Sequence, residues 1–219
     1  MRLSFITFIS LAAAAAALVA CAKEADVNNP EENIATDMPD FDYVTYIYQD
    51  SFEDGAEGWS FYDNDGDGKT WYVTDADVMH SGNYALWSRS WTESDGSLDP
   101  NNYAVSPAIH LTENNYLSFW VTTDQSISPE HYAVYLWDES EPVDPLLGVL
   151  LLEQTFSPEP TSEYLIEDDG AGYQHYAIPI PADYFDKTVY IGFRHFNCND
   201  LNYLAIDDVG IIEPLLFPK

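Results

Sequence analysis

Three aspartates at alternating positions form the chain's most distinctive chemical motif, Asp63-Asn64-Asp65-Gly66-Asp67-Gly68. Alternation lets three carboxylates converge on one hard cation, and a glycine permits the sharp turn that wraps the loop around the ion. A solvated turn without metal also favours Asp, Asn and Gly. We predict a structural calcium site here, with Asp63, Asp65 and Asp67 as ligands.

The helix-loop-helix form of a calcium motif is not expected. That form requires a bidentate glutamate at the twelfth position, where this chain has Thr74, with Asp75 one residue further on. No helical pattern flanks the motif. The sequence therefore favours a calcium-binding turn on a β scaffold.

A second acidic group is formed by residues that are far apart in the sequence. Glu53 and Asp54 follow the first expected strand, and Asp207 and Asp208 lie in the last one. The two pairs would meet if these strands are neighbours. Successive side chains on a strand point to opposite faces, so only one of the last two aspartates is expected to face a given site, and Asp208 is favoured. The alternative is a set of ordinary carboxylates at strand ends.

Catalytic motifs are not evident in the sequence. There is no Gly-x-Ser-x-Gly elbow and no His-Glu-x-x-His helix. Cys198 and His195 are close in sequence and out of register for a catalytic pair. Carboxylate pairs arise by chance among 38 acidic residues, so they do not indicate a hydrolase. We predict that the chain is not an enzyme, with a jelly-roll glycoside hydrolase as the least favoured alternative.

Arg194 lies in an apolar strand, where a buried guanidinium needs a carboxylate partner. Glu130 and Glu153 are the candidates for a structural ion pair. The alternative is that Arg194 or His131 contacts a ligand.

Exposed indoles would indicate a carbohydrate-binding surface, because sugars stack on aromatic platforms. Trp59, Trp87, Trp91 and Trp137 are the candidates for such ligand contacts. Two coplanar, solvent-facing indoles would favour a glycan as the ligand.

The first 20 residues have the pattern of a secretory signal peptide: Arg2, an apolar run over residues 5–18, and small residues at the end. The run is too short for a comfortable membrane-spanning helix. Leu18-Val19-Ala20-Cys21 resembles the bacterial lipobox, which implies a lipid-modified Cys21 at the mature N-terminus. Several acyl chains anchor a protein stably. Residues 22–26 resemble signals for the outer face of the outer membrane, so we expect a cell-surface location.

Cysteine usage and charge limit the ways in which the domain can be stabilised. Cys198 is the second of two cysteines, so an intrachain disulfide is not expected once Cys21 is lipidated. The net charge is -31, which repels nucleic acid and anionic lipid headgroups and favours divalent counter-ions. The domain must therefore rely on its core or on metal.

Short runs of β-branched and aromatic residues alternate with Gly, Pro, Asn and Asp turns, as in an antiparallel sandwich or barrel. We expect an acidic tether over residues 21–42, an all-β domain over 43–213 and a tail over 214–219. The expected strands are 45–52, 71–74, 84–88, 103–106, 116–122, 131–137, 147–155, 175–180, 188–196 and 203–212.

Several segments in collinear order resemble the cleaved adhesin domains, the haemagglutinin/adhesin modules attached to gingipain proteases. They are Ser51-Phe52-Glu53 with Gly58-Trp59, the aspartate motif followed by Trp71, Ser81-Gly82-Asn83-Tyr84, Leu98-Asp99-Pro100-Asn101-Asn102-Tyr103 with Ser106-Pro107, Leu117-Ser118-Phe119-Trp120, Glu130-His131-Tyr132-Ala133-Val134-Tyr135, Phe193-Arg194-His195-Phe196-Asn197 and Ile206-Asp207-Asp208-Val209.

This resemblance implies a β jelly roll, structural calcium, and adhesion to host proteins, haemoglobin or haem-containing material, or cells. Glu53, the aspartate motif and Asp207 or Asp208 are the calcium candidates that it implies. Residues 141–169 depart from the family pattern. We expect a lipoprotein whose partners are host or extracellular proteins, with glycans as the alternative and with membrane attachment through lipid alone.

Overall fold

The computed structural model describes residues 41, 43–75, 78–124, 130–141, 143–144, 147–169 and 172–215. By contacts, all the described residues belong to one compact unit, residues 39–219. The expected signal peptide, the lipidated Cys21, most of the tether and the last four residues lie outside the described residues. Within the described residues, no helix has the length and apolar character to cross a membrane.

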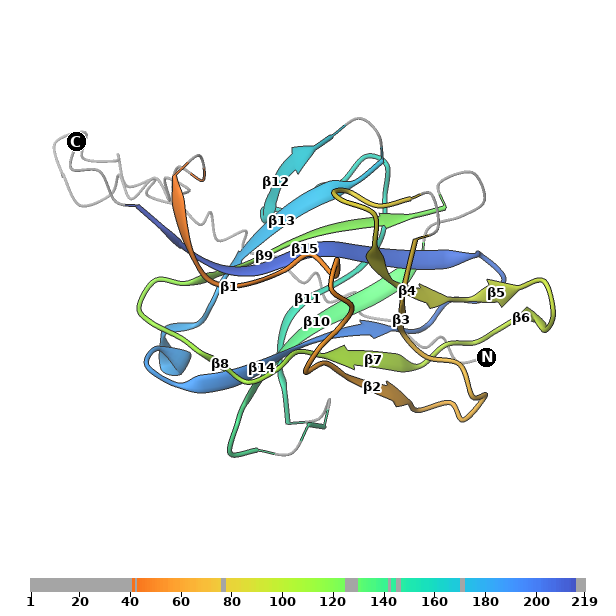
Figure 1. Ribbon diagram of the computed structural model, residues 1–219, viewed down its shortest axis with the longest axis horizontal. Coiled ribbons are helices and arrows are strands. Elements are labelled where there is room, and N and C mark those ends of the chain that lie inside the picture. Colours follow the sequence, from red (N-terminus) through yellow and green to blue (C-terminus); the bar gives the residue numbers. More distant parts are fainter. Residues whose placement is uncertain are drawn as a thin grey trace, which may run out of the picture. The chain divides into compact units, whose positions relative to one another are not determined.

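The first sheet has seven antiparallel strands (Figure 1). In spatial order they are β12 (Leu165–Asp168), β13 (Gln174–Pro179), β9 (Tyr116–Thr123), β15 (Tyr203–Pro214), β4 (Ala85–Arg89) and β3 (Tyr72–Thr74), with β1 (Val44–Asp50) also paired to β15. Strands β4 and β1 pair with successive halves of one edge of β15, and β9 pairs with the other edge. The long strand β15 is therefore the centre of this sheet.

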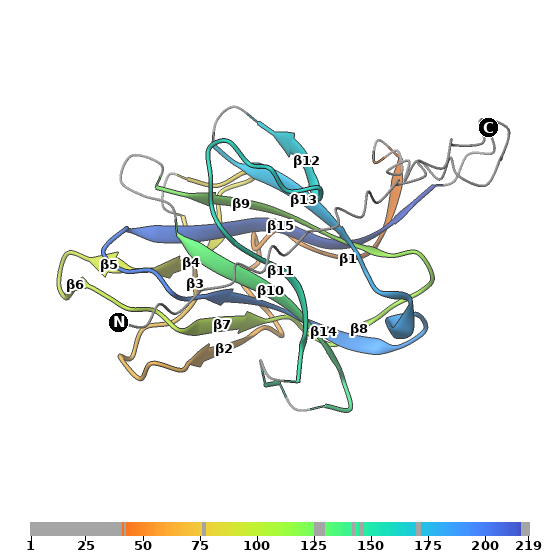
Figure 2. The ribbon, with the colours of Figure 1, turned by 180° about the vertical axis from the view of Figure 1, so that it is seen from behind.

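The second sheet has six antiparallel strands and forms the other layer of the sandwich (Figure 2). Its order is β11 (Val149–Thr155), β10 (His131–Asp138), β14 (Thr188–His195), β7 (Asn102–Val105) and β2 (Ser60–Asp63), with β8 (Ile109–His110) paired to β14. A small hairpin of β5 (Trp91–Thr92) and β6 (Gly96–Ser97) and a 3-10 helix η1 (Ala182–Tyr184) complete the described elements.

Alternation along the central strands explains why both faces of each sheet are apolar. In β10, Tyr132, Val134 and Leu136 belong to the core between the sheets. Trp137 and its neighbours on the opposite face form a smaller outer cluster. Side chains two residues apart share a face, so this strand contributes to two hydrophobic clusters at once.

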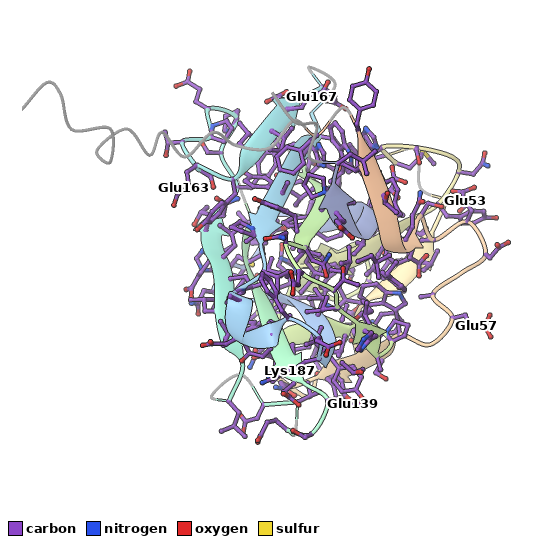
Figure 3. All side chains as sticks on the ribbon, turned by 90° about the vertical axis from the view of Figure 1, so that its left-hand side faces the viewer. Glu53, Glu57, Glu139, Glu163, Glu167 and Lys187 are labelled. Atoms are coloured by element: carbon purple, nitrogen blue, oxygen red, sulfur yellow. The ribbon has the colours of Figure 1, made fainter. Side chains whose placement is uncertain are left out.

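The acidic side chains lie mainly on the surface. Glu57 and Glu163 are exposed and point away from the sandwich (Figure 3). The self-repulsion of this surface opposes folding, so the apolar core and any bound cation must offset it.

The predicted fold class, an all-β antiparallel sandwich of jelly-roll type, is confirmed. Each of the ten predicted strands matches an observed strand to within two residues at either end. Strands β2, β5, β6, β8 and β12 were not predicted. They span two to four residues and offer little alternation to recognise, although β3 and β7, which are equally short, were predicted.

Candidate functional site

The aspartate turn follows the end of β2, and it brings its three carboxylates together. One oxygen from each of Asp63, Asp65 and Asp67 lies within 4.8 Å of the others. Asp63 accepts hydrogen bonds from the backbone N–H groups of Gly66 at 2.7 Å and Gly68 at 2.8 Å. Both glycines have positive φ, +78° and +80°, which glycine adopts without steric cost. The structure thus brings together the three carboxylates that the motif places at alternating positions.

Neighbouring segments hold the turn in place. The Asn101 backbone N–H donates to Asp65 Oδ2 at 2.5 Å, and the Asn64 N–H donates to the Asn101 carbonyl at 3.1 Å. Lys69 forms an ion pair with Asp95 of the β5–β6 hairpin at 2.9 Å. The turn is thus fixed to the loop before β7 and to the hairpin.

The charges of the turn favour a cation. Hydrogen bonds from the Gly68 and Gly66 N–H groups lower the pKa of Asp63. The pKa of Asp67 is raised, first by its partial burial and then by the negative charges of Asp65 and Asp63. A bound calcium ion would take oxygen ligands from all three residues and relieve this repulsion. The residues present therefore fit the ion that the sequence motif indicates.

The second acidic group holds one loop, residues 80–84, from two sides. Glu53 accepts hydrogen bonds from the backbone N–H groups of Asn83 at 2.7 Å and Tyr84 at 2.8 Å. The fully buried Asp207 accepts from the backbone N–H of His80 at 2.9 Å and of Ser81 at 3.1 Å. These carboxylates have a visible structural role in fixing the loop between β3 and β4.

The expectation that Asp207 and Asp208 face opposite sides is wrong. Asp208 Oδ1 accepts a hydrogen bond from the Ser81 hydroxyl at 3.0 Å, and its Oδ2 lies 2.7 Å from His80 Nδ1. Both aspartates therefore contact the same loop. The reason is a β-bulge: the register shifts between Asp207 and Gly210, and Asp208 has a φ of +46°. A bulge breaks the alternation on which the prediction rested.

Substitution of Gly82 tests the hold of Glu53 on this loop. The Cβ of an alanine at this position would lie 2.3 Å from Glu53 Cδ, so the carboxylate must leave its N–H partners. Gly82 also has a φ of +62°, and a left-handed conformation costs an L-residue roughly 1–2 kcal/mol. We expect Gly82→Ala to lower the urea midpoint of unfolding.

The matched control is Gly96→Ala, at a position with a φ of +75° and nothing within 4 Å of the added Cβ. It incurs the backbone strain alone, so Gly82→Ala should be the more destabilised of the two. Equal midpoints for the two variants would show that the contacts of Glu53 do not stabilise the fold.

The four candidate tryptophans do not form an aromatic platform. Trp59, Trp87 and Trp137 are 8%, 3% and 1% exposed. Trp87 stacks on Tyr203 with 4.0 Å between ring centroids. Trp91 alone among the four is exposed, at 38%. The expectation of ligand contacts is therefore wrong for the three buried indoles, because Trp59 packs in the core between the sheets and Trp137 and Trp87 pack in two smaller hydrophobic clusters.

The expectation that Arg194 pairs with a carboxylate is also wrong. Its guanidinium donates from Nε and Nη2 to Asn101 Oδ1, at 3.0 and 2.8 Å, and lies 3.9 Å from the centroid of the Phe196 ring. Glu130 instead contacts His195, and Glu153 contacts His131. Among the described residues, an amide oxygen and an aromatic face take the place of the expected ion pair of this arginine.

Cys198 and His195 are adjacent, contrary to the expectation from their spacing. The Cys198 sulfur lies 3.2 Å from His195 Nε2, because β14 ends at His195 and Asn197, with a φ of +54°, turns the chain back. Burial, followed by the charge of Glu130, raises the pKa of the Cys198 thiol far above its ordinary value. A protonated, buried thiol is a poor nucleophile.

An aromatic stack without any signal in the sequence lies on the outer face of the first sheet. His80 stacks on Trp120 at 3.7 Å between centroids, and Trp120 is 4.7 Å from His175. Burial, followed by the charge of His80, lowers the pKa of His175 to about 4. Pairing of Trp120 with His175 across β9 and β13 brings them together, and this register is not readable from the sequence.

The shifted pKa of His175 predicts a pH dependence of stability. Its folded pKa lies below the unfolded value of 6.5, so the unfolded chain binds the proton more readily between those values. The stability that neutral His175 provides is fully present above pH 6.5. As the pH falls from 6.5 towards 4, the free energy of unfolding decreases by up to roughly 3 kcal/mol. His175→Gln should flatten the pH profile of urea unfolding in this range. The exposed His110→Gln is the control, and identical slopes for wild type and His175→Gln would refute the assignment.

Comparisons with known proteins place the chain in a family. Residues 45–211 match the model of the Cleaved Adhesin Domain. Hemagglutinin A of Porphyromonas gingivalis (strain ATCC BAA-308 / W83) is 35% identical over 185 residues, covering 79% of this chain and 8% of that protein. The chain thus spans less than a tenth of this relative.

Solved structures agree with the sequence match. The K1 cleaved adhesin domain of Lys-gingipain from Porphyromonas gingivalis W83 superposes with a TM-score of 0.60 and 33% identity, covering 75% of this chain and 96% of that domain. The K3 domain of the same protein superposes with a TM-score of 0.61 and 28% identity, covering 77% of this chain and 98% of that domain. The chain belongs to the cleaved adhesin domain family.

Proposed function

We propose that this chain is a non-catalytic, adhesin-like binding module for host or extracellular proteins, carried on the cell surface. The observation that supports this most strongly is the family match over residues 45–211. The similarity to a protein named Hemagglutinin A makes erythrocytes the first cell type to test.

The geometry around Cys198 supports a module without catalysis. A thiol-based mechanism needs a histidine that takes the thiol proton from one ring nitrogen while an acid orients the other. Here Glu130 and Cys198 both approach His195 Nε2, and Nδ1 contacts Ser88. The cluster therefore lacks the order that nucleophilic catalysis requires.

Structural calcium is part of the proposal. The convergent carboxylates of Asp63, Asp65 and Asp67 support an ion at the aspartate turn. Glu53, Asp207 and Asp208 are the further candidates that the family resemblance implies. Among the described residues these three do not form a group with ligand atoms within 4.8 Å of one another, so we place the principal ion at the turn.

Export and lipid anchoring through Cys21 complete the proposal. They rest on the signal-peptide pattern and the Leu18-Val19-Ala20-Cys21 tetrapeptide. The tether would hold the domain away from the outer membrane, and the lipid on Cys21 would attach the chain to that membrane. Metabolic labelling with a radioactive fatty acid should mark the wild-type chain and leave Cys21→Ser unlabelled.

Adhesion of coated beads tests the binding function. Residues 39–219 form a compact unit with its own core, so this unit is expected to fold alone. Beads carrying many copies gain avidity over a single weak contact. We expect them to bind erythrocytes above the level of beads coated with heat-unfolded domain. Equal binding by both kinds of bead would contradict an adhesin function.

A glycan ligand is the second candidate, and the exposed aromatic residues at the hairpin end favour it. Trp91 is 38% and Tyr72 37% exposed. Tyr72 lines a cleft of about 370 Å³ together with Lys69 and Arg89. If this surface binds sugars, soluble polysaccharide in a native gel should retard the domain, and Trp91→Ala should abolish the retardation.

A further inference from the structure

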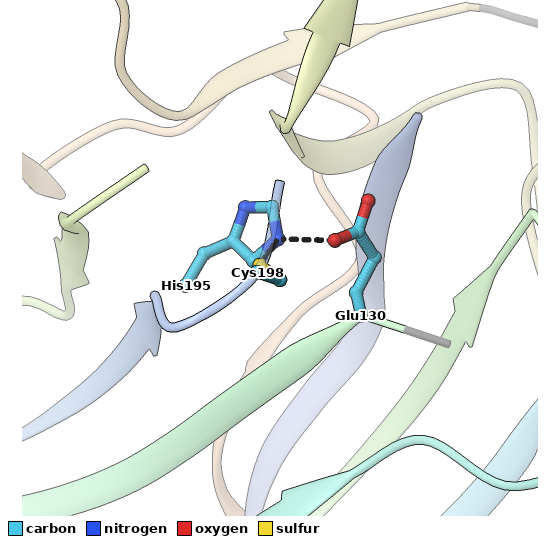
Figure 4. Close-up of side chains that lie close together, drawn as sticks. All are labelled: Glu130, His195 and Cys198. Carbon is cyan, nitrogen blue, oxygen red and sulfur yellow. Dashed lines mark hydrogen bonds and ion pairs between the residues drawn. The ribbon is translucent and has the colours of Figure 1, made fainter. Parts of the chain in front are cut away.

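Three buried or half-buried side chains of different chemistry meet at one point between the sheets (Figure 4). Glu130 precedes β10, His195 ends β14, and Cys198 follows in the next loop. His195 Nε2 lies 3.2 Å from Glu130 Oε2 and 3.2 Å from Cys198 Sγ. One oxygen, one nitrogen and one sulfur thus converge, all within 4.8 Å of one another.

These separations match the edges of a metal tetrahedron. Zinc binds carboxylate oxygen, imidazole nitrogen and thiolate sulfur at about 2.0–2.3 Å, which places neighbouring ligand atoms roughly 3.3–3.7 Å apart. The two separations at His195 Nε2 are close to this range. Oxygen, nitrogen and sulfur together also suit a borderline-soft ion better than calcium, which selects oxygen.

The charge of the cluster points the same way. Glu130 and His195 are fully buried, and a buried carboxylate is costly without a compensating charge. The described lysine and arginine side chains contact other groups: Lys69 with Asp95, Arg89 with Tyr72, Lys187 with Asp138 and Arg194 with Asn101. The compensating charge must therefore come from a protonated His195 or from a bound cation. A doubly charged cation would neutralise the carboxylate and a thiolate together.

Outer hydrogen bonds orient the ligands as metal sites require. Ser88 Oγ lies 2.8 Å from His195 Nδ1, and the Ser90 hydroxyl donates to Glu130 Oε1 at 2.5 Å. With the ring proton on Nδ1 donated to Ser88, the lone pair of Nε2 faces Glu130 and Cys198. Such second contacts fix the tautomer and the ring orientation of metal-bound histidines.

Of the three side chains, Cys198 borders a surface cleft, whereas Glu130 and His195 are fully buried. Cys198 lines a cleft of about 410 Å³ with Asp99, Asn101 and Asn199. Three protein ligands leave the fourth tetrahedral position open, as in sites that retain a water molecule.

We propose that Glu130, His195 and Cys198 bind one zinc ion, whose fourth position is taken by water from this cleft. Binding releases the Cys198 thiol proton, and the two charges of the ion balance the carboxylate and the thiolate. The site is separate from the aspartate turn in its residues and in its choice of ion.

Cobalt is the optical probe that tests this proposal. Residues 39–219 contain one cysteine, so a thiolate-to-cobalt absorption band reports on Cys198 alone. Stripped of metal with chelator, the domain should bind one Co²⁺ with this band, and Zn²⁺ should remove it while excess Ca²⁺ does not. Absence of the band at saturating cobalt would overturn the proposal.

Substitutions distinguish the residues proposed to bind the metal from the residues that orient them. Cys198→Ser should lose the band, and Asp63→Asn/Asp65→Asn/Asp67→Asn should keep it. Ser88→Ala removes an orienting contact and no ligand, so it should weaken cobalt binding by roughly tenfold or more. Unchanged affinity in Ser88→Ala would contradict the orienting role of this serine.

A measurement on the unsubstituted domain covers the case in which Cys198→Ser does not fold. Bound Zn²⁺ should slow alkylation of Cys198 at least about tenfold, and chelator should restore the original rate. Equal alkylation rates with and without Zn²⁺ would overturn the proposal, whatever the behaviour of the variants.

Discussion

Calcium is expected to stabilise residues 39–219 by about 2.7 kcal/mol when it is present at a hundredfold excess over its Kd. The reason is that the ion binds the folded turn and has little affinity for the unfolded chain. Thermal and urea unfolding with calcium and with chelator would measure the difference. In a domain of this size each kcal/mol shifts the Tm by roughly 2–4 °C.

The variant Asp63→Asn/Asp65→Asn/Asp67→Asn should lose this calcium effect. Asparagine retains the shape of the side chains and removes their charges, so the ion loses its principal attraction. In chelator the variant lacks the repulsion that raises the pKa of Asp67, but Asp63 and Asp65 each lose one of the two oxygens that accept backbone N–H groups. The calcium shift of each protein is therefore measured against its own stability in chelator.

Two controls separate specific binding from charge screening. Glu139→Gln/Glu141→Gln/Glu163→Gln removes the same number of charges at exposed positions and should retain the calcium shift. Magnesium, which sheds its water reluctantly, should stabilise less. A calcium shift of equal size in the aspartate variant and in the wild type would exclude the turn as the site.

Trp71→Ala is expected to cost about 3–5 kcal/mol, as truncation of a buried aromatic side chain generally does. Trp71 is 1% exposed, and its Nε1 donates to the Asn102 carbonyl at 3.1 Å. The substitution leaves a cavity and removes the hydrogen bond to Asn102, which pairs with Asp63 of the aspartate turn. Calorimetry should show a Tm lower by roughly 10 °C.

Trp91→Ala is the matched control, because it removes the same side chain from an exposed position. Its unfolding free energy should change by less than about 1 kcal/mol. A Trp71→Ala variant as stable as Trp91→Ala would contradict the packing described for the core.

The extent to which the structure follows from the sequence depends on the range of the interactions. Long strands such as β9 and β14 were predictable because eight residues of alternating or continuous apolar character are a strong local signal. The aspartate turn was predictable for the same reason, since its ligands lie within five residues of one another. Its anchoring by Asn101 was not, because that contact depends on tertiary pairing.

Predictions about the other residues failed where the backbone departs from regular geometry. The bulge at Asp208 and the turn at Asn197 each place a non-glycine residue at positive φ, and neither has a clear sequence signal. The first turns Asp207 and Asp208 to one loop, and the second brings Cys198 to His195. The prediction of a carboxylate partner for Arg194 failed for a different reason. The amide of Asn101 and the ring of Phe196 take the place of the expected carboxylate.

Adhesion of domain-coated beads to erythrocytes treated with protease or with glycosidase is the decisive test of the proposed function. A module that binds extracellular protein should lose adhesion after protease treatment and keep it after removal of glycans. Adhesion that survives protease treatment and disappears with the glycans would contradict a protein ligand and assign the domain to carbohydrate recognition.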